Sequence, residues 1–225
     1  EPQRRNTAMA VAWAAQRIAA ENPEAVMAVL SADHHIPDRF AFGRAIKAAA
    51  QAAASEKVLV TLGIRPTRPE VGYGYIHQGP LASAEHPQMH RVRRFVEKPD
   101  SARAVRFVQL GDYLWNAGVF VWSAQTLLEE ISRHAPALHR ALAPLRKTPR
   151  GRNHKAVESA YRKAPSLPID VAILEQSDRV WTIPVDFAWS DVGTWLSLGE
   201  ELSVGVPAES RPTSAASRRD AQGNC

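Results

Sequence analysis

Two short, mainly apolar runs constrain the fold of this chain more than any other feature of its sequence. They are Ala25–Leu30 (AVMAVL) and Lys57–Ile64 (KVLVTLGI). Continuous apolar runs of this length are typical of strands that are buried on both faces of a sheet. The segment between them includes the alanine-rich stretch Asp38–Ala54, which predicts a helix. A strand, a helix and a strand in this order predict a parallel βαβ unit, and so an α/β domain with a mixed, mostly parallel sheet.

Further helices and strands alternate along the rest of the chain. A helix is predicted over RNTAMAVAWAAQRIAA, with Asn6 or Thr7 as its cap. Strands are expected at GYGYIHQG, MHRVRRFVEKP, AGVFVW and RVWTIPV, and helices at SARAVRFVQL, after a cap at Ser123, over much of Pro136–Gln176 and from Asp191. Residues Ser203–Ala221 are rich in Ser, Pro, Ala and Arg and predict a linker or tail. We therefore expect one folded domain over residues 1–202, followed by a separate segment over residues 203–225.

The composition argues against several classes of protein. Of the 225 residues, 45% are hydrophobic and 23% are charged, which is typical of a globular domain. The net charge of +5 is spread along the chain, without a basic stripe interleaved with aromatic residues, so we expect no nucleic-acid partner. There is no apolar run near the roughly 20 residues that span a bilayer and no signal-peptide pattern, so we expect no membrane partner. The single cysteine, Cys225, fits a reducing, cytoplasmic location.

Two acidic residues lie where catalytic groups are found in α/β domains, just beyond the ends of strands. Asp33 follows the first apolar run by three residues, and Asp191 precedes the last predicted helix. Each has an alternative role, as a turn or helix-capping residue for Asp33 and as a helix cap for Asp191. As a pair they are suited to hold one Mg²⁺, which proteins typically bind through one or two carboxylates, several waters and phosphate oxygens.

Three further segments have side chains suited to a sugar phosphate. In GYGYI, Gly72 and Gly74 allow a backbone to approach a ligand, although such glycines also mark ordinary turns and bulges. Glu97 is suited to accept sugar hydroxyls and Lys98 to meet phosphate, although the two also suit a weak surface ion pair. Asn116 is suited either to bind a polyol or to form a turn.

Seven segments, taken in order, resemble the sequential blocks of the mannose-1-phosphate guanylyltransferases, also called GDP-mannose pyrophosphorylases. They are EPQRRNTAMA, LSADHHI, LVTLGIRPTRPEVGYGYI, FVEKPD, WNAGVFVW, PIDVAILE and WSDVGTW. The resemblance runs from Glu1 to about Leu198 and implies a Rossmann-like nucleotidyltransferase domain. In such an enzyme a phosphate oxygen of mannose 1-phosphate attacks the α-phosphorus of GTP in line, which yields GDP-mannose and pyrophosphate.

The resemblance also implies which residues are catalytic. Asp33 and Asp191 match the family's motifs for binding the Mg²⁺ that bridges the reacting phosphates. Lys98 matches the residue that neutralises phosphate charge. These three residues are the candidate catalytic residues, and a homodimer is a possible assembly.

The same resemblance implies the substrate contacts. Glu97, Asn116 and the backbone of Gly74 are expected to hold the mannose hydroxyls. Asn6 and Thr7, from the block EPQRRNTAMA, are expected to line the site for the nucleotide.

The chain departs from the family pattern at several points. The family's opening strand and its Gly-Gly-x-Gly-Thr-Arg loop around the triphosphate have no counterpart, because no two glycines are adjacent. The final RRDAQGNC resembles the opening of the family's C-terminal β-helical region and then stops. Val71 and Pro168 stand where the family has Thr and Ser. We therefore expect a domain incomplete at its N-terminus, with little or no transferase activity as this fragment.

Two other functions fit the sequence less well. A related enzyme making a different nucleotide sugar, such as an ADP- or dTDP-hexose, would share most of these blocks. A non-catalytic homologue that only binds nucleotide sugars would keep the fold. The presence of Asp33 and Asp191 together with Lys98 argues against the non-catalytic homologue, because a binding module has no need of a metal pair.

Overall fold

The computed structural model describes residues 1–146 and 154–192. Its internal contacts divide the chain into two units, which we describe separately. The first unit comprises Glu1–Ala32 and Ile36–Trp189, and the second comprises Asp33–His35 and the chain from Ser190 onward. The expected last helix, the expected tail and the boundary at residue 202 lie outside the described residues.

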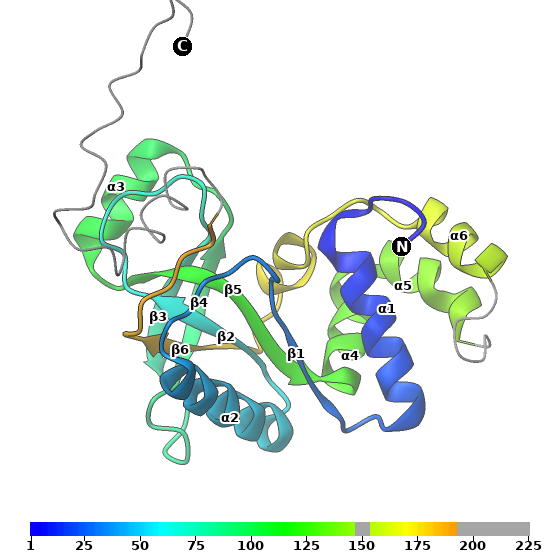
Figure 1. The fold of residues 1–225 in the computed structure, drawn as a ribbon, viewed down its shortest axis with the longest axis horizontal. Helices are drawn as coiled ribbons and strands as arrows, with labels where there is room; N and C mark the ends of the chain where they lie inside the picture. Colours follow the sequence, from blue (N-terminus) through cyan, green and yellow to red (C-terminus); the bar gives the residue numbers. More distant parts are fainter. Residues whose placement is uncertain (147–153, 193–225) are drawn as a thin grey trace, which may run out of the picture. The chain divides into compact units, whose positions relative to one another are not determined.

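A six-stranded mixed sheet forms the centre of the first unit (Figure 1). In the order in which they lie side by side, its strands are β1 (Val26–Val29), β5 (Tyr113–Ser123), β2 (Leu59–Ile64), β6 (Val180–Val185), β4 (His90–Val96) and β3 (Tyr75–Leu81). β5 is antiparallel to β1 and β2, and also to β3, with which it pairs in addition. β4 is antiparallel to β3 and to β6, which leaves β2 and β6 as the parallel pair among the described strands.

This topology confirms the α/β class and the mixed sheet, but the expectation of a mostly parallel sheet is wrong. β1 and β2 do run in the same direction, as a βαβ unit requires, because both are antiparallel to β5. β5 nevertheless lies between them, so they do not pair with each other. The apolar pattern of two runs indicates that each is a buried strand, and it contains no information on which later strand separates them.

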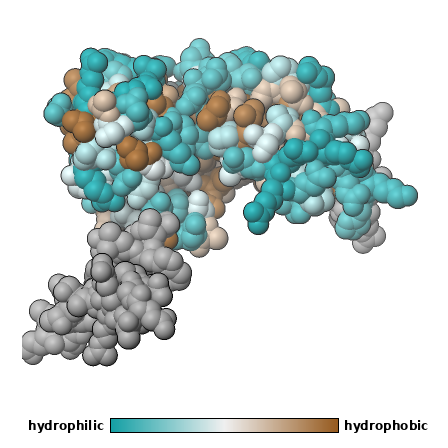
Figure 2. Space-filling model, turned by 90° about the horizontal axis from the view of Figure 1, so that it is seen from above, coloured by the Kyte–Doolittle hydropathy of each residue, from teal (hydrophilic) through white to brown (hydrophobic). Residues whose placement is uncertain are grey.

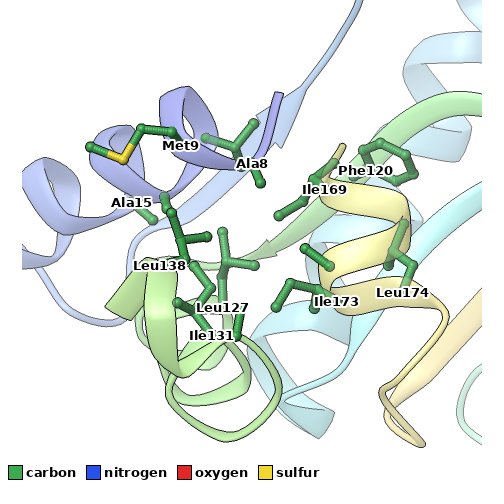
Figure 3. Packing of buried hydrophobic residues seen from close by; sticks show 14 of the residues in the cluster. Ala8, Met9, Ala15, Phe120, Leu127, Ile131, Leu138, Ile169, Ile173 and Leu174 are labelled. Atoms are coloured by element: carbon green, nitrogen blue, oxygen red, sulfur yellow. The ribbon is translucent and has the colours of Figure 1, made fainter. Parts of the chain in front are cut away.

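Helices cover both faces of the sheet. They are α1 (Asn6–Glu21), α2 (Arg39–Glu56), α3 (Ser101–Leu110), α4 (Ala124–His134), α5 (Pro136–Leu142) and α6 (His154–Lys163), with a 3₁₀ turn (Ala143–Leu145) and a π turn (Asp170–Leu174). On one face, Leu114 and Trp122 of β5 pack with α1, α4, α5, α6 and the π turn. On the other face, Tyr113 and Val121 of β5 pack with α2 and α3. Figure 3 shows how residues of the π turn, such as Ile173, pack among apolar side chains of the helices on the first face.

The starts of two helices show where local sequence rules succeed and where they fail. The hydroxyl of Ser123 caps α4, as predicted, by accepting a hydrogen bond from a backbone N–H three residues later (3.0 Å). The predicted cap of α1 by Asn6 or Thr7 is wrong, because Arg5 occupies the cap position and makes no side-chain cap. The Thr7 hydroxyl instead accepts a hydrogen bond from the N–H of Ile169 (2.9 Å), more than 150 residues away in sequence. A tertiary contact has replaced the local one.

β1 forms one edge of the sheet. It pairs with β5 on one side, and among the described residues no strand pairs with its other side. The segment Val26–Leu30 is wholly apolar, with Ala28 exposed and Leu30 49% exposed. Edge strands are usually protected by charged side chains, prolines or bulges, and this stretch has none of them.

The surface is mainly hydrophilic on the face drawn in Figure 2, where apolar residues form separate small patches. None of the helices in the described part of the chain is long and apolar enough to cross a membrane.

Candidate active site

Polar side chains from three elements of the first unit meet around Asn116 of β5. Thr61 of β2 donates its hydroxyl to Asn116 Oδ1 (3.0 Å), and the backbone N–H of Gly118 donates to the same oxygen (3.2 Å). Asn116 Nδ2 in turn donates to Oδ1 of Asp170, the first residue of the π turn (3.0 Å). Asn116 is only 9% exposed and lies within a strand, so its alternative role as a turn residue is wrong.

Gly74 lies beside this cluster, directly before β3. Its carbonyl oxygen accepts a hydrogen bond from the Asn116 N–H (2.8 Å). A Cβ atom at Gly74 would lie 2.5 Å from Glu97 Oε2 and 3.3 Å from the ring of Phe95, so any larger residue would displace that carboxylate from its present position. At Gly72 the nearest atom to such a Cβ is 3.4 Å away, which is ordinary contact. Of the two glycines, Gly74 is therefore the one that the site requires.

Glu97 is the carboxylate that this arrangement accommodates, with its side chain 22% exposed. Burial raises its pKa to about 7, and the negative charge of Asp170 adds to this effect. The ammonium of Lys98, 3.9 Å from Glu97 Oε1, lowers the same pKa, whereas Glu175 raises it. Glu175 also accepts a hydrogen bond from the backbone N–H of Glu97 (2.9 Å). Three carboxylates thus lie close together, with one exposed ammonium beside them.

The raised pKa of Glu97 predicts how stability depends on pH. An unfolded glutamate titrates near 4.5, and Glu97 in the folded chain near 7. Between these values the folded state keeps a proton that the unfolded state has lost, so the free energy of unfolding falls as the pH rises from about 4.5 to about 7. Glu97→Gln should remove this part of the dependence. Urea unfolding of both proteins at about pH 5 and about pH 8 measures it, and equal pH effects in the two would contradict the assignment.

The backbone is strained near several of the candidate residues. Four non-glycine residues in the described part of the chain have a positive φ, and three of them are Asn6 (56°), Lys98 (45°) and Val192 (47°). The first two are candidate site residues, and Val192 follows Asp191 directly. A β-branched residue is especially unfavourable at such an angle. Strained residues of this kind cluster at functional sites, where the surrounding structure holds them in place.

The second unit brings the two aspartates predicted to bind metal into one neighbourhood. His35 and Ser190 form an antiparallel bridge, in which each backbone N–H donates to the other residue's carbonyl oxygen (2.9 and 3.1 Å). His34 precedes this bridge, and burial lowers its pKa. The negative charges of Asp33 and Asp191 both act in the opposite direction on His34. The bridge joins the two segments that contain Asp33 and Asp191, so these residues belong to one neighbourhood of the second unit.

This pair of carboxylates fits the donor set that Mg²⁺ prefers. No group of three or more His, Cys, Asp or Glu side chains is arranged to hold a metal ion within residues 1–146 and 154–192. A site with two protein carboxylates leaves the remaining positions to water and phosphate oxygens, as is usual for Mg²⁺. Asp33 and Asp191 are therefore suited to hold an ion that arrives with a phosphorylated ligand, and their metal-binding role stays a prediction.

The two residues expected at the nucleotide site have contacts of a different kind. Asn6 Oδ1 accepts a hydrogen bond from the N–H of Thr7 (2.9 Å), and the Thr7 hydroxyl holds the backbone of Ile169, just before Asp170. Thr7 thus fixes the start of the π turn. The nucleotide contacts expected of Asn6 and Thr7 stay a prediction.

The structure adds residues to the sugar side of the site that the sequence analysis does not assign. Thr61 and Asp170 form hydrogen bonds with Asn116, and Glu175 accepts one from the backbone N–H of Glu97. A signal for Asp170 was present, because it is an isolated acidic residue within the apolar stretch LPIDVAIL. A polar Thr61 within a buried strand is a weaker signal of the same kind.

The fold and these polar groups define an α/β domain with a carboxylate-rich cluster of side chains suited to a polyol. The sequence profile of the family described as Nucleotidyl transferase matches residues 1–203. The chain therefore belongs to the nucleotidyl transferase family, an enzyme family.

Relatives within this family agree with the resemblance described above. The alginate biosynthesis protein AlgA of Pseudomonas putida is 41% identical over 202 residues, which cover 89% of this chain and 41% of the relative. The mannose-1-phosphate guanylyltransferase of Escherichia coli is 39% identical over 207 residues, which cover 89% of this chain and 43% of the relative. A crystal structure from Thermus thermophilus, described as a mannose-1-phosphate geranyltransferase, is 36% identical with a TM-score of 0.79, over 90% of this chain and 57% of that one. The chain thus spans about two fifths of the length of these curated relatives.

Proposed function

We propose that this chain provides the sugar-phosphate and metal-binding part of an enzyme that transfers a guanylyl group from GTP to mannose 1-phosphate, forming GDP-mannose and pyrophosphate. The observation that carries the proposal is the arrangement of Gly74, Glu97 and Asn116. The missing Cβ of Gly74 gives space to a carboxylate, and a fixed amide lies beside it. Neighbouring sugar hydroxyls both donate and accept hydrogen bonds, so they are matched by a carboxylate next to an amide.

The reaction asks the protein for positioning and for charge neutralisation. A phosphate oxygen of mannose 1-phosphate forms a bond to the α-phosphorus of GTP, and the bond from that phosphorus to the bridging oxygen of pyrophosphate breaks. Glu97 and Asn116 orient the sugar, and Lys98, whose side chain is 66% exposed, is available to a phosphate oxygen. A Mg²⁺ held by Asp33 and Asp191 would neutralise phosphate charge.

Equilibrium binding tests this proposal most directly, because it depends only on residues of this chain. Isothermal titration calorimetry should show that mannose 1-phosphate binds more tightly than glucose 1-phosphate or free mannose. Formation of GDP-mannose from GTP, mannose 1-phosphate and Mg²⁺ is a separate measurement, in which this chain alone should show little or no activity. Tighter binding of glucose 1-phosphate would favour another hexose 1-phosphate as the substrate. If no sugar phosphate binds, the proposal is wrong.

The metal pair leads to a separate prediction. Asp33→Asn and Asp191→Asn should each weaken the binding of Mn²⁺, a paramagnetic substitute for Mg²⁺, by about tenfold or more, because each removes one of two anionic ligands. Electron paramagnetic resonance in the presence of GTP measures the bound ion. Asp178→Asn, at an exposed residue, is the control and should bind Mn²⁺ like the unchanged chain. Unchanged Mn²⁺ affinity in both of the first two variants would exclude a site formed by these carboxylates.

A further inference from the structure

The hydrogen bonds of Asn116 leave one position of its amide open. A side-chain amide accepts two hydrogen bonds at its oxygen and donates two at its nitrogen. Both acceptor positions of Oδ1 are filled, by the Thr61 hydroxyl and the Gly118 N–H. One N–H of Nδ2 is donated to Asp170. The second N–H has no hydrogen-bond partner among the described residues of the chain.

The partners of this amide determine its orientation, because the alternative orientation loses the bonds to the Gly118 N–H and to the ionised carboxylate of Asp170. If the amide turned over, Nδ2 would face the backbone N–H of Gly118, which only donates. Oδ1 would then face the carboxylate of Asp170, which accepts when ionised. Asn116 is therefore held as a donor, and its open position suits an acceptor oxygen.

We propose that Thr61 and Asp170 are positioning residues that hold Asn116 as the hydrogen-bond donor to one hydroxyl oxygen of the bound sugar, and so help to select the sugar. The inference rests on the proposed function, since it takes mannose 1-phosphate as the ligand. Thr61 acts on Asn116 from the neighbouring strand of the sheet and is fully buried. Neither residue needs to touch the substrate for this role.

The position of Asp170 is itself fixed by the fold. The residue before it, Ile169, donates its N–H to the hydroxyl of Thr7 (2.9 Å). The carbonyl oxygen of Asp170 accepts a hydrogen bond from the N–H of Glu175 (2.9 Å), which closes the π turn. The carboxylate is therefore presented to Asn116 by a turn that is tied at both ends.

A matched pair of substitutions separates positioning from packing. Thr61→Val removes the hydroxyl and keeps the shape, so the affinity for mannose 1-phosphate should fall about tenfold, and Thr61→Ser should restore it. The control is Thr182→Val. Thr182 pairs with Thr61 across β2 and β6, is equally buried, and has a hydroxyl without a partner among the described residues. Thr182→Val should leave the affinity unchanged.

Asp170→Asn tests the other positioning residue, and should also weaken binding about tenfold because an amide no longer fixes the orientation of Asn116. Urea unfolding of each variant establishes that it is folded. If one variant fails to fold, the other and the Thr61→Ser rescue still test the proposal.

Deoxy sugars provide the readout that a merely structural role would not change. The affinities of the unchanged chain and of Thr61→Val are measured for 2-deoxy, 3-deoxy and 4-deoxy analogues of mannose 1-phosphate. The loss caused by Thr61→Val should disappear for the one analogue that lacks the hydroxyl bound by Asn116, and persist for the others. An equal loss for every analogue, or no loss for any sugar, overturns the inference while the proposed function stands. Failure of the unchanged chain to bind mannose 1-phosphate instead refutes the proposed function, and the inference with it.

Discussion

Glu97→Ala should weaken the binding of mannose 1-phosphate by about a hundredfold or more, the largest functional effect expected of a single substitution in this chain. At about pH 8, above its pKa of about 7, Glu97 is mainly ionised. Hydrogen bonds to a charged group contribute about 1.5–3 kcal/mol each, and a carboxylate can accept from two neighbouring hydroxyls. The substitution removes the carboxylate that lies beside Gly74. Isothermal titration calorimetry with mannose 1-phosphate measures the loss.

Two further variants test whether the loss of affinity is caused by the carboxylate of Glu97. Glu97→Gln keeps the size of the side chain and part of its hydrogen bonding, so its affinity should lie between those of the unchanged chain and Glu97→Ala. Glu85→Ala, at an exposed glutamate in the loop between β3 and β4, is the control and should bind normally. Equal affinity of Glu97→Ala and the unchanged chain would mean that the sugar binds elsewhere.

Glu130→Ala should produce the largest loss of stability, about 3 kcal/mol or more in the free energy of unfolding. Glu130 lies in α4 with its side chain fully buried, and its carboxylate accepts a hydrogen bond from the hydroxyl of Ser177 (2.6 Å). It also lies 3.4 Å from the guanidinium groups of Arg133 and Arg179 and 3.2 Å from the ring of His134. Arg179 and His134, whose side chains are only 24% and 27% exposed, would lose their buried anionic partner and Ser177 would lose its acceptor, which together should cost about 3 kcal/mol. Urea unfolding measures the loss.

Glu129, the residue before Glu130, supplies the control for the predicted loss of stability. Glu129 also contacts Arg179 (3.3 Å), but its side chain is 41% exposed. Water screens an exposed pair, so Glu129→Ala should lower the free energy of unfolding by at most about 1 kcal/mol. If the two substitutions prove equally destabilising, burial does not account for the effect of Glu130.

Local sequence rules predict the parts of this fold that depend on neighbouring residues. The extent of α3 and the cap of α4 by Ser123 agree with the prediction, because a helix and its cap are decided within a few residues. The placement of β5 between β1 and β2 was not predictable in this way. It depends on pairing between segments that are 50 or more residues apart in sequence.

The residues of the candidate site also fall into two groups, those that local motifs indicate and those that only the folded structure brings together. Short motifs indicate Glu97 and Asn116, because their polar groups follow or interrupt apolar strands. The contribution of Asp170 arises only when the π turn is folded against β5, so the sequence alone indicates an acidic residue without a partner. The structure thus explains how the amide of Asn116 is held, which the motif does not contain.

Among the described residues no strand pairs with the outer side of β1, and this sets a condition on handling this polypeptide in isolation. A row of backbone N–H and C=O groups without charged side chains beside it is a template on which another extended chain can add, residue by residue. Such growth begins from the native fold and needs no melting of the core. Whether preparations remain monodisperse therefore depends on protein concentration as much as on the free energy of unfolding.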